Sequence, residues 1–553
     1  MSKDTTRSSR AGKKNGATRS AASTRNGSAA AGRTRAGAGQ EASRSGARDG
    51  GRRNTSRRTD SRLSREERAR QRKRASEEKL KLRRTNKEIM TVCTVVTLLF
   101  VGIIGYMAYF LYNDADTYRN NSYNSKRQTL LEDKYTRGEI QASDGTTLAV
   151  TEVDDDGDET RTYLFGRIFA HVVGYTANGV AGLESQAASY LLESHTNPLL
   201  RILDALQGNK SVGDTVTTTL NVTLQEVAYE ALGDNDGAVV VLEPSTGKVL
   251  AMVSKPDFDP NTLAEDWDSL VSDDNTDANL VNRATQGLYT PGSTFKLLTV
   301  LEYIREYPNS WEDFEFTCTG SYTVDGYTIK CSHSAVHGTQ MLEEAFANSC
   351  NGAFAYLGQM LSFSSFYELC ESVGYNQTWS GGVPGTASSF VLDNNNSLWD
   401  ILQTSIGQGE TTVTPIFNAM IAAAVANDGV MMTPYLLSSV TSQYGDKVES
   451  FTSSEYLTIM TEEEAEILQG MMELVVSDGT GDEAAGDGYT AAGKTGSAEV
   501  SSDAETNAWF IGYATSDSNP DKQIAVSVIV EGGGSGGSVA APIAKKIFEA
   551  YFN

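Results

Sequence analysis

The chain has 553 residues with a formal net charge of −24, and 39% of its residues are hydrophobic. Residues 1–88 hold 27 Lys+Arg and 9 Asp+Glu, a net charge of +18, so the remaining residues carry a net charge of −42. This composition excludes a wholly disordered chain, and 5 cysteines exclude a disulfide-dense small domain. The split in charge indicates two compartments or two kinds of partner.

The first 88 residues form a basic tail. Residues 1–60 consist mostly of Gly, Ala, Ser, Thr and Arg, so they cannot bury enough apolar surface to offset the entropy of ordering. Residues 61–88 are helix-permissive and strongly basic. We predict a disordered cytoplasmic tail over 1–88 that is attracted to anionic lipid or fixes membrane topology, and we expect no nucleic-acid partner.

A membrane-spanning helix is predicted over residues 89–112, because this stretch contains no charged residue. At about 1.5 Å per residue it spans ~36 Å, enough to cross a ~30 Å hydrocarbon core. The alternatives are a cleaved signal peptide and a buried core helix, but the basic leader and the apolar run are both too long for a signal peptide. Basic residues before the segment and acidic residues after it predict a single-pass protein of the cell membrane, with its N-terminus in the cytoplasm.

The acidic remainder divides into a short module over residues 113–219 and a larger domain over 220–553. Two apolar runs, Gly237–Leu242 and Lys248–Val253, predict a hairpin around a Pro-Ser-Thr-Gly turn. Further strands are predicted at Asn507–Tyr513 and Gln523–Val530, and an amphipathic helix at Ala541–Phe552. Strands at both ends with helices between them predict an α/β (α+β) fold whose sheet joins distant parts of the chain.

The strongest catalytic signal is the sequence Tyr-Thr-Pro-Gly-Ser-Thr-Phe-Lys over residues 289–296. A helix that starts at Ser293 places Ser293 and Lys296 on one face, three residues apart. A lysine kept neutral by burial can remove the serine proton, and the helix N-terminus offers backbone N–H groups to a developing oxyanion. Taken by itself, Ser-x-x-Lys is a weak signal.

Two further motifs follow this one. Ser349, Cys350 and Asn351 come after a predicted helix. Lys494, Thr495, Gly496 and Ser497 precede a predicted strand edge, where glycine admits a substrate backbone and the cation and hydroxyls suit a carboxylate. Ser-x-x-Lys, Ser-x-Asn and Lys-Thr-Gly are the motif set of β-lactamases and penicillin-binding proteins.

On these motifs the chain resembles a class B penicillin-binding protein from residue 89 to its end. The resemblance extends to the segments Gly237–Asn261, Asn282–Lys296, Ser405–Glu410 and Ala508–Tyr513, and more loosely to Arg137–Ala149. It implies an antiparallel sheet flanked by helices, an all-helical subdomain, and a short N-terminal pedestal or dimerisation-like module over 113–219. It also implies a peptidoglycan D,D-transpeptidase that β-lactams acylate.

The resemblance further implies a role for each motif residue. Ser293 would attack the D-Ala-D-Ala stem peptide, Lys296 would take its proton, and Ser349 would pass a proton to the leaving D-Ala. Asn351 would hold the peptide amide, and Lys494, Thr495 and Ser497 the terminal carboxylate beside Gly496. Backbone N–H groups of Ser293 and Ser497 would form the oxyanion hole. No cofactor is expected for catalysis, and a SEDS-family glycan polymerase is the expected membrane partner.

A metal site is predicted beside the second motif. Cys318, Cys331, His337 and Cys350 offer three thiolates and an imidazole, a set typical of structural zinc. A Cys318–Cys331 disulfide is the alternative, and His333 competes as a ligand. We expect Cys370 to be a core residue, Glu152–Tyr163 a solvated acidic loop, and Gly532–Gly537 a simple turn.

Three other functions share the motifs: a D,D-carboxypeptidase, a serine β-lactamase and a β-lactam sensor. The sequence offers no recognisable deacylating glutamate for the β-lactamase and only one span for the sensor. It leaves open whether the enzyme serves elongation, division or sporulation, and which residue accepts the cross-link.

Overall fold

The structure is a computed structural model of the chain. It describes residues 65–113, 131–197, 206, 210–272, 274–392, 396–499 and 505–553, with side chains up to residue 110 in the first range. The predicted disorder over residues 1–60 therefore falls outside the described residues. Residues up to Leu98 and residues from Leu99 onward form two compact units.

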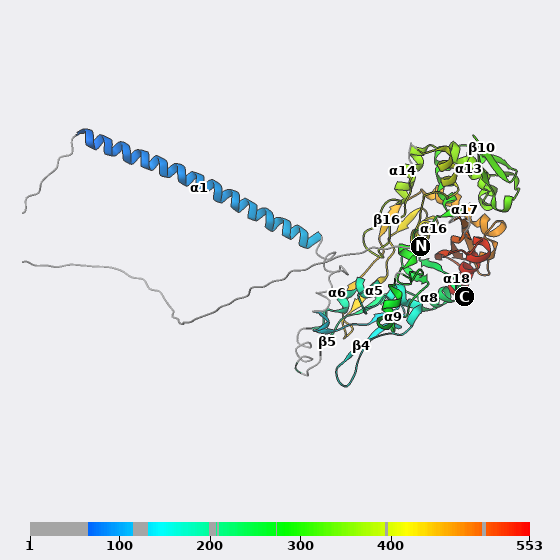
Figure 1. Cartoon of the computed structure of the whole chain (residues 1–553), viewed down its shortest axis with the longest axis horizontal. Helices are drawn as coiled ribbons and strands as arrows, with labels where there is room; N and C mark the ends of the chain where they lie inside the picture. Colours follow the sequence, from blue (N-terminus) through cyan, green and yellow to red (C-terminus); the bar gives the residue numbers. More distant parts are fainter. Residues whose placement is uncertain are drawn as a thin grey trace, which may run out of the picture. The chain divides into compact units, whose positions relative to one another are not determined.

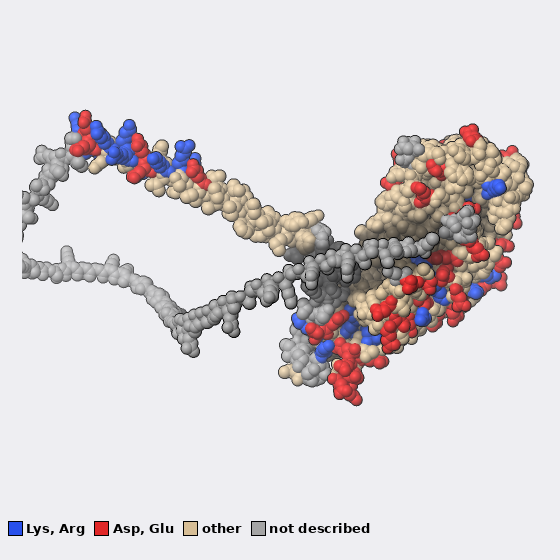
Figure 2. All heavy atoms as spheres, in the orientation of Figure 1, with Lys and Arg blue, Asp and Glu red and all other residues tan. Residues whose placement is uncertain are grey.

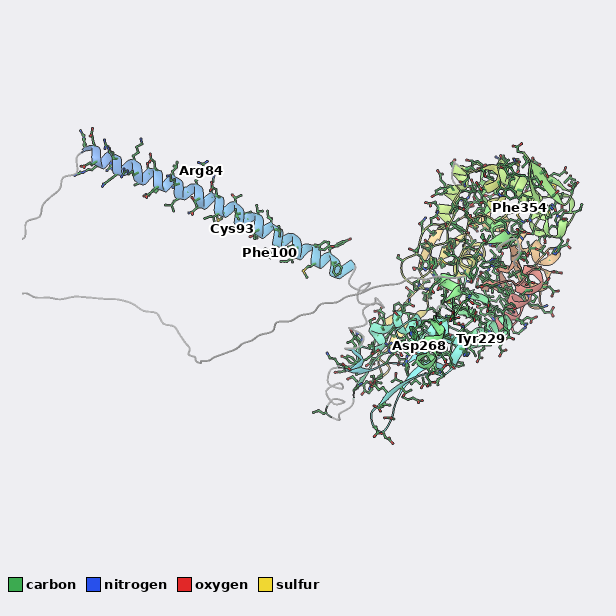
Figure 3. All side chains as sticks on the ribbon, in the orientation of Figure 1. Arg84, Cys93, Phe100, Tyr229, Asp268 and Phe354 are labelled. Atoms are coloured by element: carbon green, nitrogen blue, oxygen red, sulfur yellow. The ribbon has the colours of Figure 1, made fainter. Side chains whose placement is uncertain are left out.

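The helix α1 (Arg65–Asn113) contains both the basic segment and the predicted membrane span. The prediction of disorder is therefore wrong for residues 65–88, where Ala, Glu, Lys and Arg favour helix and continue the apolar helix toward the N-terminus. Figure 3 shows Arg84 in the basic part and Cys93 and Phe100 in the apolar part. Phe100 is 59% exposed and the apolar window is unburied, as expected of a surface that faces lipid.

The N-terminal module is built on a six-stranded sheet with the order β15-β14-β6-β2-β3-β4. Two of its strands, β14 (Leu437–Thr441) and β15 (Lys447–Ser450), come from the later part of the chain. The β14–β6 pairing therefore ties the module directly to the larger domain. The module's other elements are β1 (Tyr135–Thr136), β2 (Ile140–Gln141), β3 (Thr147–Val153), β4 (Glu159–Tyr163), η1 (Gly166–Phe169), α4 (Ala170–Val173), α5 (Gly182–Gln186), α6 (Ala188–Leu191), β5 (Ser211–Val212) and β6 (Thr215–Thr218).

A buried charge network holds the module together. Glu184 is fully buried and accepts hydrogen bonds from Arg137 at 2.8 Å and from Arg161 at 2.7 Å. Two guanidinium groups around one carboxylate satisfy a charge that would otherwise be costly to bury. Loss of either arginine would therefore destabilise the module.

The larger domain has a five-stranded antiparallel sheet with the order β17-β18-β19-β7-β8. Val239 and Val241 of β7 face one hydrophobic cluster, whereas Ala238 and Val240 face another, so both sides of the sheet are buried. Helices α8 and α18 pack on the first side and α16 on the second. The sheet and these helices are β7 (Gly237–Leu242), β8 (Val249–Lys255), β17 (Tyr489–Ala498), β18 (Asn507–Ser516), β19 (Asn519–Val530), α8 (Val222–Leu232), α16 (Pro415–Ala426) and α18 (Ala541–Phe552).

Figure 1 shows a mostly helical subdomain around α13 and α14, whereas α9 packs near α4 and η6 packs on β18. The helical subdomain also carries two small sheets, β9–β12 and β10–β11, that the expectation of an all-helical subdomain did not include. The elements from α9 onward are α9 (Leu263–Leu270), α10 (Arg283–Gln286), η2 (Gly292–Phe295), α11 (Lys296–Glu306), η3 (Trp311–Asp313), β9 (Glu315–Cys318), β10 (Ser321–Val324), β11 (Tyr327–Lys330), η4 (Ser332–Ser334), β12 (Gly338–Met341), α12 (Leu342–Ala347), α13 (Asn351–Met360), α14 (Phe363–Val373), α15 (Leu398–Ser405), β13 (Val430–Met432), β16 (Glu455–Thr458), α17 (Glu462–Asp478), η5 (Asp482–Ala484) and η6 (Gly536–Ala540).

Candidate active site

The serine of the first motif lies on a 3₁₀ turn, η2, that runs directly into α11. Gly292 precedes it with φ +56°, a conformation that favours glycine, and its N–H donates to the carbonyl of Gly407 at 2.9 Å. A Cβ on Gly407 would lie 1.7 Å from the Gly292 carbonyl oxygen. The Ser405–Glu410 segment therefore packs directly against the turn that carries the nucleophile. Sequence similarity alone did not assign this role.

Lys296 is fully buried at the start of α11. Its amine donates to Asn351 Oδ1 at 2.7 Å, to the Ser349 carbonyl at 2.8 Å and to Ser349 Oγ at 3.2 Å. Burial lowers the pKa of Lys296 to about 7, opposed by the nearby Cys350 and Cys331 thiols. A lysine with this pKa is neutral in a large fraction of molecules near pH 7 and is suited to act as a general base.

The second motif depends on a strained residue. Ser349 follows α12 with φ +53°, a left-handed conformation that non-glycine residues rarely adopt. The next residue, Cys350, caps α13 by accepting a hydrogen bond from the Ala353 N–H at 3.4 Å. The turn directs Ser349 and Asn351 toward Lys296 while the thiol is fully buried. Strain of this kind is commonly found at functional sites.

The third motif lies on β17 at the edge of the five-stranded sheet. Lys494 is fully buried, and burial together with the charge of Lys296 lowers the pKa of its amine. Gly496 faces the nucleophile turn closely, because a Cβ there would lie 3.2 Å from the Pro291 carbonyl oxygen. Ser497 is exposed next to it. The structure therefore brings all eight predicted catalytic and substrate-binding residues to one region of the fold.

One neighbour of the third motif was missed by the sequence analysis. Thr480 Oγ1 lies 2.5 Å from Thr495 Oγ1, and its backbone N–H donates to the Ala347 carbonyl at 3.2 Å. Thr480 therefore links the third motif to the helix that leads into the second. It lies in a loop after α17, and neither period nor spacing marks it as a site residue.

The glycine-rich segment Gly532–Gly537 is more than the simple turn that we expected. The Gly536 N–H donates to Ser497 Oγ at 3.4 Å, and a Cβ on Gly536 would lie 2.5 Å from the Gly496 carbonyl oxygen. The strand before it is followed by Glu531, which accepts hydrogen bonds from Arg283 at 2.8 Å and Tyr289 at 2.6 Å. Close approach of two backbones explains why residue 536 is a glycine.

The predicted metal ligands form one cluster beside the second motif. The ligand atoms of Cys318, Cys331, His337 and Cys350 all lie within 4.8 Å of one another, and the three cysteines are buried. The Cys318–Cys331 and Cys331–Cys350 sulfur separations are 3.6 and 3.8 Å, and His337 Nδ1 lies 3.4 Å from Cys318 Sγ. These cysteines are free thiols in the structure, so the alternative of a Cys318–Cys331 disulfide is not present. His333 is exposed and contacts Ser332 instead.

The other predictions for single residues have clear outcomes. Cys370 is fully buried in the core, as predicted. His195 lies 2.5 Å from Asp214, and His171 lies 3.4 Å from the Pro256 carbonyl. The solvated loop predicted over Glu152–Tyr163 is confirmed only for residues 154–158, which are exposed at the tip of the β3–β4 hairpin; Glu159–Tyr163 forms β4, and Tyr163 is buried.

The helical subdomain that carries α13 and α14 has few charged side chains on its visible face. Figure 2 shows acidic residues gathered over the lower part of the second unit, around β4 and α9, whereas the part that carries α13, α14 and β10 is mostly uncharged on the visible face. Figure 3 shows Phe354 within this region, and the Lys296 amine lies 5.2 Å from its ring centroid. Burial among such groups lowers the pKa of the amine to about 7, whereas the ring contact itself favours the charged form.

Taken together, the geometry suits acyl transfer through a serine ester. A serine on a helix-initiating turn lies three residues before a buried amine, that amine contacts a second hydroxyl, and a hydroxyl-rich strand is available for an anionic group. Each part corresponds to one requirement of serine acyl-enzyme chemistry: nucleophile, base, proton carrier and anion subsite.

Comparison with known proteins agrees with this geometry. Residues 237–549 match the family model described as penicillin binding protein transpeptidase domain. Residues 137–216 match the model described as penicillin binding protein A dimerisation domain. The chain is 31% identical over 455 residues to the peptidoglycan D,D-transpeptidase PbpA of Mycolicibacterium smegmatis, covering 77% of this chain and 91% of that protein. It is 29% identical to the stage V sporulation protein D of Bacillus subtilis, covering 74% of this chain and 65% of that protein.

Solved structures are similar as well. The ceftriaxone acyl-enzyme complex of penicillin-binding protein A from M. tuberculosis has a TM-score of 0.68 at 29% identity, covering 76% of this chain and 100% of that chain. The D,D-transpeptidase domain of a peptidoglycan glycosyltransferase from Eggerthella lenta has a TM-score of 0.67 at 29% identity, covering 75% of this chain and 98% of that chain.

Proposed function

The chain belongs to the penicillin-binding protein transpeptidase family and is a serine D,D-transpeptidase, and from that premise we propose that it cross-links peptidoglycan stem peptides through an acyl-enzyme on Ser293. Its substrate would be the D-Ala-D-Ala end of one stem, and β-lactams would acylate the same serine. The observation that carries this proposal is the contact of the buried Lys296 amine with both Ser349 and Asn351, in a chain whose first motif places Ser293 three residues earlier.

The first half-reaction transfers the stem peptide to the enzyme. As Ser293 Oγ attacks the carbonyl of the penultimate D-Ala, Lys296 takes the hydroxyl proton. Ser349, 3.2 Å from Lys296, then gives its hydroxyl proton to the departing D-Ala amine and takes in return the proton that Lys296 received from Ser293. The C–N bond breaks, and an ester on Ser293 remains.

The substrate is held by the second and third motifs. Asn351 accepts a hydrogen bond from Lys296 through Oδ1, and its Nδ2 donates to the carbonyl of Lys330 at 3.0 Å, so its amide is oriented to meet the donor backbone. Lys494, Thr495 and Ser497 bind the terminal carboxylate beside Gly496, and the backbone N–H groups of Ser293 and Ser497 receive the oxyanion. The pKa of Lys494, which burial lowers, would rise when a carboxylate binds.

The second half-reaction distinguishes a transpeptidase from a carboxypeptidase. In the transpeptidase an amine of a neighbouring stem attacks the ester, a new C–N bond forms, and Ser293 regains its proton. Water would play this part in a carboxypeptidase. The 31% identity to a D,D-transpeptidase supports the amine acceptor.

Covalent labelling tests the site. The full chain in detergent is incubated with a fluorescent penicillin, and wild type is compared with Ser293→Ala. The matched control is Ser372→Ala on α14, which removes a serine hydroxyl that donates to the Leu369 carbonyl within its own helix. We expect stable labelling of wild type and Ser372→Ala and none of Ser293→Ala. Equal labelling of all three would refute the assignment of the nucleophile.

An acceptor assay tests the reaction. A D-amino acid supplied together with a D-Ala-D-Ala stem peptide should yield an exchange product, because an amine can take the acyl group from Ser293. Hydrolysis of the stem with no exchange product would favour the carboxypeptidase.

We also propose that the cluster of Cys318, Cys331, His337 and Cys350 binds structural zinc. Zinc binds sulfur at about 2.3 Å and nitrogen at about 2.0–2.1 Å. In a tetrahedral site two sulfur ligands are therefore about 3.8 Å apart, and a sulfur and a nitrogen ligand are about 3.5 Å apart. Three of the six separations, at 3.6, 3.8 and 3.4 Å, fit these values, and all six lie within 4.8 Å. The ion would hold Cys350, and with it the strained turn at Ser349.

Metal analysis tests the zinc proposal directly. We expect about one zinc per chain in the wild type and loss of zinc in Cys318→Ser, with Cys370→Ser as the control that keeps it. Metal content well below one per wild-type chain would refute the proposal. Chelation should lower the melting temperature and slow penicillin labelling, because the strained turn at Ser349 would relax.

The membrane assignments rest on α1. One apolar helix near the N-terminus fits a single-pass anchor. We propose that the basic residues 65–88 stay in the cytoplasm against anionic lipid and that residues 131–553 lie outside, because basic flanks remain inside. Protease access to the catalytic domain in intact spheroplasts would test this orientation, and protection of that domain would reverse it.

The domain boundaries and the membrane partner are also proposals. We assign residues 113–219 to a pedestal and 220–553 to the transpeptidase domain, joined by the β6–β14 pairing. A SEDS-family polymerase is the proposed membrane partner, because a transpeptidase of this kind needs a separate source of glycan. Co-purification with and without α1 would test that partner.

A further inference from the structure

One lysine stands apart from the other charged residues of the helical subdomain. From residue 306 to residue 446 the sequence contains a single Lys or Arg, Lys330, against 14 Asp and Glu. Its side chain is exposed at the end of β11. In Figure 2 the subdomain that carries α13, α14 and β10 is correspondingly poor in blue. Lys330 therefore supplies the one positive side chain of this stretch of sequence.

The backbone of this lysine lies beside the catalytic amine. The Lys330 carbonyl accepts a hydrogen bond from Asn351 Nδ2 at 3.0 Å, and Asn351 Oδ1 accepts one from the Lys296 amine at 2.7 Å. One side-chain amide therefore bridges Lys330 and the general base. The β10–β11 hairpin fixes this position through four cross-strand pairs, in which Lys330 pairs with Ser321.

The ammonium group of Lys330 has no acidic partner among the residues that the structure describes. Some other cations of the second unit do have such partners: Arg305 pairs with Glu464 at 2.8 Å, Arg283 with Glu531 at 2.8 Å and Lys248 with Glu243 at 2.8 Å. Forming an ion pair with a ligand at Lys330 would therefore break no existing ion pair. Because the Lys330 backbone contacts Asn351, the exposed Lys330 side chain starts beside the group that holds the substrate.

From this placement we infer that Lys330 is a specificity residue for the donor stem peptide. The inference rests on the proposed function, in which Asn351 holds the backbone of the donor. The residue that precedes D-Ala-D-Ala then passes Lys330. Lys330 binds a carboxylate on the side chain of that residue, so that the enzyme prefers stems whose third residue is acidic over stems in which it is neutral or basic.

A pair of matched penicillins tests the inference, because the acyl side chain of a penicillin occupies the place of the preceding residue. One carries an adipyl side chain that ends in a carboxylate, and the other carries the corresponding carboxamide. The second-order acylation rates of both are measured on the full chain in neutral detergent. Since exposed ion pairs are weak, we expect the wild type to prefer the carboxylate about two- to five-fold at about 50 mM salt. Screening should bring that ratio close to one at about 1 M salt.

The variants separate a binding role from a structural one. Lys330→Gln should bring the ratio of the two rates to about one, Lys330→Arg should keep the preference, and Lys330→Glu should invert it. Lys447→Gln, which removes an exposed lysine in β15, should leave the wild-type ratio intact. A general loss of activity lowers both acylation rates alike and cancels in their ratio. A partly unstable variant therefore still gives a meaningful ratio.

Two results would overturn the inference: a wild-type ratio of one at low salt, or an unchanged preference in Lys330→Gln. Benzylpenicillin is run beside both compounds as a check on the proposed function. If benzylpenicillin acylates Ser293 while the ratio is one, the specificity role fails and the transpeptidase assignment stands. If benzylpenicillin does not acylate the wild type, the proposed function fails and the inference fails with it.

Discussion

Replacing Ser349 by glycine is expected to stabilise the protein relative to alanine at the same position, while both variants lose activity. The reason is the φ of +53° at Ser349. A left-handed residue with a Cβ costs about 1–2 kcal/mol, and glycine avoids this cost. The greater freedom of glycine in the unfolded chain offsets about 0.4–1 kcal/mol. The Gly variant should therefore be more stable than the Ala variant by about 0.5–1 kcal/mol.

The comparison of two variants isolates the backbone. Ser349→Ala and Ser349→Gly both remove the hydroxyl that lies 3.2 Å from the Lys296 amine, so the loss of this contact cancels. Only the Cβ differs between them. The urea midpoints of the two variants, measured on the same preparation of the full chain in detergent, give the difference in free energy of unfolding.

A control reverses the sign. Ser372 lies near the end of α14 with an ordinary helical backbone. There, glycine should be less stable than alanine by up to about 1 kcal/mol, because glycine disfavours helix. If Ser349→Gly were equal to or less stable than Ser349→Ala, the turn would not be strained in solution. Penicillin labelling should fall in both Ser349 variants, because neither can carry a proton to the leaving group.

Three further predictions concern titration and substrate binding. The acylation rate should rise with pH and reach half its maximum near pH 7, because the base must be neutral and burial lowers the pKa of Lys296 to about 7; a flat profile between pH 6 and 8 would exclude Lys296 as the base. Thr480→Val should slow acylation by a carboxylate-bearing penicillin about tenfold, because the Thr480 hydroxyl orients Thr495. Thr480→Ser should restore the wild-type acylation rate, and equal rates in the two variants would refute this role of the hydroxyl. Burial raises the pKa of Glu302 from 4.5 to about 7. As the pH rises, the Glu302 carboxyl therefore loses its proton in the unfolded chain before it does so in the folded protein, and the free energy of unfolding falls between pH 4.5 and 7. Glu302→Gln should therefore raise the free energy of unfolding at pH 8, by about 1–2 kcal/mol once solvent screening of the carboxylate is allowed for, and not at pH 4; a gain of equal size at both values, measured by urea denaturation, would show that the charge is not the cause.

The sequence alone predicted those elements whose pattern lies within one short segment of the chain. The strand Gly237–Leu242 and the helix Ala541–Phe552 were predicted with the bounds that the structure has, because an unbroken apolar run and a 3.6-residue period each indicate one element. The spacing of Ser293 and Lys296 on one turn is local as well. Their convergence with the second and third motifs came from family resemblance, since no short-range rule brings residues about 200 positions apart together.

What the sequence missed depends on contacts between distant segments. Thr480 acts through one hydroxyl contact, and Gly536 through backbone approach to β17. The strand β14 joins the sheet of the N-terminal module from a segment that lies far along the chain, so the module could not have been delimited correctly from composition. Side-chain periodicity carries no record of such pairings.

The left-handed turn at Ser349 shows why the metal cluster and the catalytic site are best considered as one unit. A strained serine persists only if the residues around it are held firmly. Cys350 supplies that hold on one side, because it caps α13 and contacts Cys331, while the Lys296 amine binds the Ser349 carbonyl on the other. If Cys350 no longer contacted the cluster, the turn could relax, and the Ser349 hydroxyl would move away from the Lys296 amine. Loss of the metal cluster would then abolish catalysis although every catalytic residue was still present.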